Sequence, residues 1–81
     1  MRTTRVFDLA SRLAAAAGAE ARIRRLPGGG HRIEATLPGN PDAEAHLVLL
    51  DVLTEADRYG HRHTARSHTV WAELDPPQEP P

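Results

Sequence analysis

The chain has 81 residues, a formal net charge of −1 from ten basic and eleven acidic residues, and no cysteine. A domain of this size has room for one hydrophobic core, and a large enclosed active site would compete with that core for the same apolar side chains. The charge balance favours neither a nucleic acid nor a membrane as partner. The lack of cysteine excludes disulfides, thiolate nucleophiles and cysteine-based zinc sites.

The sequence has no segment typical of secretion or of membrane insertion. The first twelve residues lack an uninterrupted apolar stretch because charged side chains divide them, namely Arg2, Arg5, Asp8 and Arg12. The longest apolar run, Leu47 to Leu50, is far too short to cross a bilayer. We therefore expect a cytoplasmic protein without a membrane partner.

A helix is predicted from Thr4 to Ala17, because the apolar residues recur at the three- and four-residue spacing of one buried helical face. These residues are Val6, Leu9, Ala10, Leu13 and Ala17. Gly18 follows directly, and glycine readily adopts the left-handed conformation that ends a helix.

Two alternating segments, Ala19–Arg25 and Arg32–Leu37, flank a glycine-rich stretch and predict a β-hairpin. A register that places Ile23 opposite Ile33 suits both faces of this hairpin. The same register pairs Ala21 with Ala35 and Arg22 with Glu34.

A second helix is predicted to begin with Asn40 as its N-cap and Pro41 as its first residue, and to run to Tyr59 before Gly60. Its apolar face comprises Ala45, Val48, Leu49, Val52, Leu53, Ala56 and Tyr59. The competing interpretation is a strand over His46–Leu53, but the helical spacing continues well beyond it.

After a polar stretch at 61–67, the alternation in Thr69–Leu74 predicts a third strand, with Val70, Ala72 and Leu74 on one face. The proline-rich residues 76–81 are expected to form a disordered tail after a single domain over residues 1–75.

The expected fold class is therefore α+β in the order α-β-β-α-β, with two helices on one face of a three-stranded, mainly antiparallel sheet. If the third strand lies beside the first, the sheet is antiparallel in the order 2-1-3. If it lies beside the second, the two run parallel through a right-handed crossover. The sequence leaves both arrangements open.

The predicted partner-binding surface centres on Trp71, which points away from the helices if its neighbours in the strand point inward. Arg22, Arg24 and Arg32 share this open face, where guanidinium and indole groups suit a protein partner or stacked bases. The alternative is that Trp71 only covers the sheet and stacks on a neighbouring arginine. Leu47 and Leu50 fall outside the buried helical face and extend the candidate surface.

Two further groups are weaker candidates. His61, His63 and His68 have a spacing that could suit a metal ion, although three histidines in a polar stretch are more often solvated. Arg58, Arg62 and Arg66 lie among them and suggest an anion site.

No arrangement typical of catalysis or of a cofactor site is recognisable. Gly28, Gly29 and Gly30 precede a strand rather than the helix that a phosphate loop needs. The sequence favours a non-enzymatic protein-interaction or regulatory module that forms a homodimer or binds another protein, and uses no cofactor. The alternative is an arginine-mediated nucleic-acid-binding domain.

Overall fold

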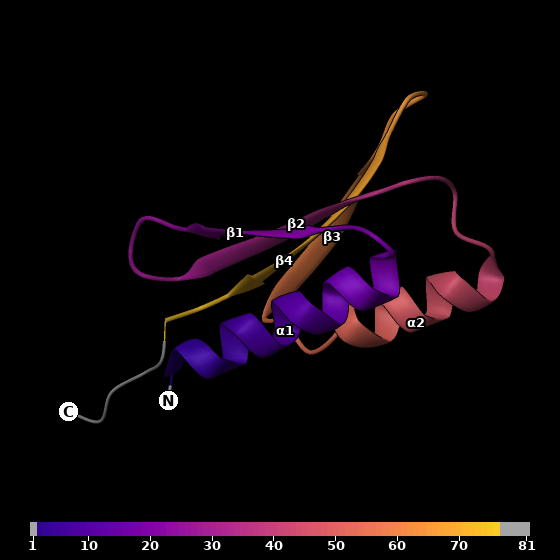
Figure 1. The fold of residues 1–81 in the computed structure, drawn as a ribbon. Coiled ribbons are helices and arrows are strands. Elements are labelled where there is room, and N and C mark those ends of the chain that lie inside the picture. Colours follow the sequence, from indigo (N-terminus) through magenta and orange to yellow (C-terminus); the bar gives the residue numbers. More distant parts are fainter. Residues whose placement is uncertain (1, 77–81) are drawn as a thin grey trace.

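A computed structural model describes residues 2–76, which form two layers, a helical layer and an antiparallel sheet (Figure 1). In chain order the elements are α1 (Arg2–Ala17), β1 (Ala21–Arg25), β2 (His31–Leu37), α2 (Ala43–Leu53), β3 (Arg58–His63) and β4 (His68–Leu74). The predicted α+β class with two helices on one face is confirmed, but the sheet has four strands instead of three.

The first half of the chain follows the prediction closely. Helix α1 ends at Ala17, and Gly18 takes a φ of 65°. In the β1–β2 hairpin, Ile23 lies opposite Ile33, and the other predicted pairs, Ala21 with Ala35 and Arg22 with Glu34, are also present.

The second helix is shorter than predicted and starts differently. Asp42, not Asn40, is the N-cap, and its carboxylate accepts a hydrogen bond from the Ala45 backbone N–H at 2.8 Å. Helix α2 ends at Leu53, so the prediction that it reaches Tyr59 is wrong. Tight-turn hydrogen bonds, from Ala56 N–H to Leu53 and from Glu55 N–H to Val52, end it instead.

The segment after this turn forms β3, which the sequence reading missed. The helical spacing that extends to Tyr59 is coincidental. In the structure Tyr59 alternates with His61 as a strand residue that faces the helical layer. Strand β3 pairs antiparallel with β4, with Gly60 opposite Trp71 and His63 opposite His68. The polar stretch expected over 61–67 is therefore part of a β-hairpin, and only its tip is a turn.

The extra strand also changes the sheet order to β1-β2-β4-β3. Of the two arrangements left open, the one that places the last strand beside the second is correct in position. Its direction is wrong, since β4 runs antiparallel to β2, with Ala35 opposite Val70. The reason is geometric: α2 carries the chain from β2 across to β3, which runs parallel to β2. The chain then reverses, and β4 returns between these two strands, antiparallel to both.

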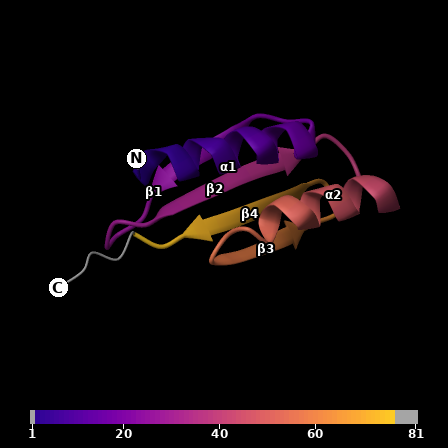
Figure 2. The ribbon, with the colours of Figure 1, turned by 90° about the horizontal axis from the view of Figure 1, so that it is seen from below.

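The core lies between the helices and one face of the sheet. Figure 2 shows α1 over the β1–β2 half and α2 beside α1, over the β4–β3 half. Every predicted apolar position of α1 is buried, as are Val70, Ala72 and Leu74 in β4. In α2 the prediction holds for Leu49, Val52 and Leu53, whereas Val48 is half exposed.

Neither helix within residues 2–76 is long and apolar enough to cross a membrane. The tail predicted over 76–81 lies, apart from Pro76, outside the described residues.

Candidate functional site

Trp71 lies on the open face of the sheet, as predicted, because Val70 and Ala72 beside it point into the core. The Arg32 guanidinium carbon sits 4.4 Å from the centroid of its ring. On β3, a Cβ atom added to Gly60 would be 2.6 Å from Trp71 Cζ2, so the indole lies against the bare glycine backbone. Trp71 is consequently only partly exposed, and its arginine neighbour is an intramolecular one.

The other charges of the open face are largely paired within the chain. Arg32 donates to Glu34 Oε1 at 2.7 Å and to Glu73 Oε2 at 2.9 Å. Arg24 is 3.6 Å from Glu34 Oε1. Two of the three arginines predicted to bind a partner therefore already face carboxylates, and Arg22 is exposed on β1 opposite Glu34.

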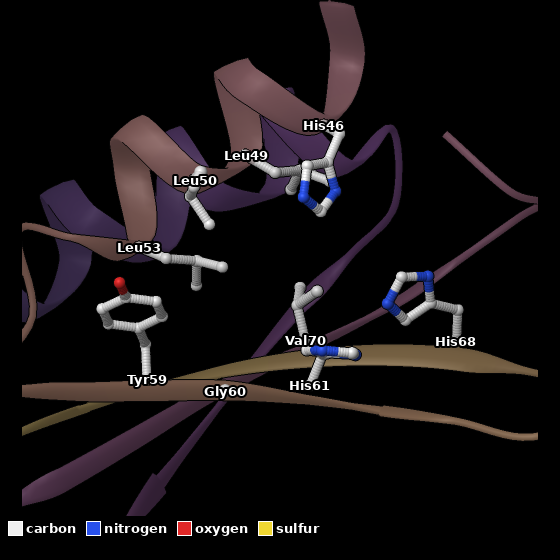
Figure 3. Close-up of a pocket in the computed structure, with 9 residues that line it drawn as sticks. All are labelled: His46, Leu49, Leu50, Leu53, Tyr59, Gly60, His61, His68 and Val70. Carbon is white, nitrogen blue, oxygen red and sulfur yellow. The ribbon is translucent and has the colours of Figure 1, made fainter. Parts of the chain in front are cut away.

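A hollow opens on the other side of the sheet, between α2 and the edge strand β3 (Figure 3). It has a volume of about 60 Å³ and is lined by His46, Leu49, Leu50, Leu53, Tyr59, Gly60, His61, His68 and Val70. We call this hollow, with the β3 edge beside it, the edge groove. Its floor and its α2 wall are mainly aliphatic, and imidazoles stand at one end.

Two of the side chains that line the edge groove, Leu50 and Tyr59, are partly exposed, whereas the exposed Leu47 is not part of its lining. Leu47 and Leu50 on α2 are 65% and 37% exposed, and Tyr59 on β3 is 43% exposed. The exposure predicted for the two leucines is thus confirmed. The groove stays open because the β3–β4 hairpin projects away from the helices toward its tip (Figure 1). Helix α2 therefore leaves the outer part of β3 uncovered.

The three candidate histidines come together on the helix-facing side of the hairpin. The ring centroids of His61 and His63 are 5.3 and 5.0 Å from that of His68. Burial, followed by the nearby His63, His61 and His46, lowers the pKa of His68. Among residues 2–76, no group of three or more His, Cys, Asp or Glu side chains is arranged to hold a metal ion.

The three arginines suggested as an anion site are not brought together. Arg58 donates to Asp75 Oδ1 at 2.6 Å and to Glu73 Oε1 at 3.2 Å, and these bonds raise its pKa. Arg62 lies farther along β3, opposite Thr69, and Arg66 lies in the turn at the hairpin tip. Arg66 also lines a second hollow of about 210 Å³ with His63, Ser67 and Asn40.

Sequence reasoning missed the edge groove because it depends on β3. The period-two alternation of Tyr59, His61 and His63 was the available signal, and the helical spacing of the preceding residues obscured it. Comparisons with protein-family models, with curated proteins and with solved structures find no match to this chain.

Proposed function

We propose that this protein is a non-enzymatic protein-interaction module that holds an extended segment of another polypeptide in the edge groove. The observation that carries this proposal is an apolar hollow beside an uncovered edge strand. Added strands gain affinity from main-chain hydrogen bonds and specificity from pockets for alternate side chains. Strand β3 offers such an edge, and the hollow between α2 and β3 offers such a pocket.

The dimensions of the hollow limit the side chain that fits. Cavities of about 150 Å³ hold benzene, whereas this one has about 60 Å³. It therefore suits the end of an aliphatic side chain better than an aromatic ring. Leu50 and Tyr59 would supply further apolar contact around it.

The partner surface inferred from the sequence around Trp71 ranks second. Arg32 covers the indole and is itself bound to Glu34 and Glu73, so a partner would have to displace internal contacts. The nucleic-acid alternative, through Arg22, Arg24, Arg32 and Trp71, meets the same obstacle. It predicts quenching of Trp71 fluorescence by a single-stranded oligonucleotide, with an affinity that falls steeply as salt rises.

A second copy of the chain is the competing occupant, as the expected homodimer requires. With both helical layers on one side, two antiparallel β3 strands centred on Gly60 would place Arg58 opposite Arg62, and two centred on His61 would place that histidine opposite its own copy. Such like-charged pairs disfavour association, increasingly as the histidines become protonated. Light scattering over a wide range of protein concentration tests self-association directly.

Selection from a displayed library of random peptides tests the proposal. We expect enriched peptides that bind the wild-type protein and lose affinity for Leu50→Glu, which places a charge in the groove. Phe7→Glu is the matched control, since Phe7 is 62% exposed on α1, away from the groove. Circular dichroism verifies that both variants fold, and Tyr59→Ser provides a second groove variant. Failure to enrich any peptide, or equal binding by groove variants and control, overturns the proposal.

A further inference from the structure

The outer part of the β3–β4 hairpin carries positive and neutral side chains. Between Arg58 and Trp71 the sequence has no aspartate or glutamate, and includes Arg62, Arg66 and three histidines. The flanking carboxylates gather at the base of the hairpin. Glu73 and Asp75 bind Arg58, and Asp57 Oδ2 accepts a hydrogen bond from the Asp75 N–H at 2.8 Å.

Imidazoles from three elements face one another at the edge groove. His46 comes from α2, His61 from β3 and His68 from β4 (Figure 3). His63 is next to His68, and Arg66 lines the adjoining hollow. The last residue of β2, Leu37, and the loop that follows contribute there as well, through Pro38, Gly39 and Asn40, and none of these side chains titrates. Within residues 2–76, the titratable groups that face His68 are thus three other histidines and Arg66, with no carboxylate among them.

We infer that the segment held in the edge groove is acidic, with one aliphatic side chain in the hollow and carboxylates toward the hairpin tip. We also infer that binding strengthens as the groove histidines take up protons. This inference rests on the proposed function and specifies the chemistry of the partner.

The alternation of strand residues assigns the ligand side chains to two faces. Residues of an added strand that face the helical layer would lie beside Tyr59, His61 and His63, and those between them beside Gly60 and Arg62. An aliphatic side chain fits next to Tyr59, where the hollow opens. Carboxylates fit next to Arg62 on the open face, and next to His61 and His63 on the face toward the helices.

The expected pH dependence follows from linkage. Burial and the neighbouring histidines lower the pKa of His68, so this imidazole is mostly neutral at neutral pH in the free protein. A bound carboxylate would favour the protonated form and raise the pKa. A ligand that raises the pKa of one imidazole by one unit gains about tenfold in affinity once the pH is below both values.

The experiment uses the full chain and three capped synthetic hexapeptides that differ only in charge. The first has one leucine and five alternating glutamates and aspartates; glutamine and asparagine replace these in the second, and lysine in the third. Isothermal titration at about pH 5.5 and about pH 8 brackets the ordinary histidine pKa of about 6.5. A single-stranded oligonucleotide is the fourth probe.

We expect the acidic peptide to bind tightest, and about tenfold tighter at the lower pH. Arg62→Gln should weaken it severalfold, whereas Arg22→Gln, an exposed arginine on the opposite edge strand, should not. His68→Gln should reduce the pH dependence. Equal binding of the neutral peptide, no effect of pH, or tighter binding of the oligonucleotide overturns the inference. Enrichment of neutral or basic peptides from the library would also overturn the inference of an acidic partner, but it would leave the proposed function intact.

Discussion

Gly60 on β3 lies directly opposite Trp71 on β4, and the indole occupies the space where a side chain at position 60 would stand. The contact ties the edge strand to the centre of the sheet. It also holds the indole under the Arg32 guanidinium. On the open face, the absence of a side chain at Gly60 thus leaves room for the large indole of Trp71.

Gly60→Ala should destabilise the protein by about 1–3 kcal/mol, the usual cost of inserting a group into a packed site. The new Cβ would be 2.6 Å from Trp71 Cζ2 and would push the indole away from Arg32. Urea unfolding followed by Trp71 fluorescence measures the effect. Gly39→Ala is the control, because an added Cβ there meets no heavy atom within 4 Å. Equal midpoints for the two variants would show that the contact contributes nothing.

Asp42→Ala should lower the unfolding free energy by about 1 kcal/mol, since it removes the side chain that caps α2. The lost interaction is the 2.8 Å hydrogen bond from the Ala45 N–H. Asp42→Asn preserves an acceptor at this position and should retain most of the stability. Chemical denaturation of both variants tests the assignment, which fails if alanine is tolerated as well as asparagine.

The Arg12–Glu55 pair should make stability depend on acid. Arg12 donates to both carboxylate oxygens of Glu55, and these hydrogen bonds lower the Glu55 pKa. A carboxylate whose pKa is lowered by folding stabilises the folded state when the pH is above its ordinary pKa of 4.5. This stabilisation is lost as the pH falls through the lowered pKa of the folded state. Urea midpoints between about pH 6 and about pH 3 should therefore drop less for Glu55→Gln than for wild type. Parallel pH profiles would contradict the pairing.

His68 should oppose folding at mildly acidic pH. Its lowered pKa means that the unfolded chain binds the proton more readily, so stability falls as the pH drops through the ordinary value of 6.5. His68→Gln should flatten this part of the profile. NMR titration of the imidazole provides the direct measurement, and a pKa at or above the ordinary value would refute the effect of burial and neighbouring histidines.

The sequence identifies the elements whose patterns are local. Alternation around the glycine-rich turn specified the pairing of Ile23 with Ile33, because a slip by one residue would turn every apolar side chain to the wrong face. The helical spacing that ends before Gly18 likewise determined the buried face of α1. The alternation within Thr69–Leu74 placed Trp71 on the open face, because the apolar residues at every second position must face the core.

Only the tertiary structure decided where α2 ends and that Tyr59 and His61 belong to a strand. Tyr59 fits helical and strand periodicity alike, and the choice depends on pairing with β4, which lies later in the sequence. The edge groove depends on this choice, because its walls come from elements that approach each other only in the folded chain. Local pattern therefore determined the faces of the individual elements, and long-range strand pairing determined the sheet order and the candidate site.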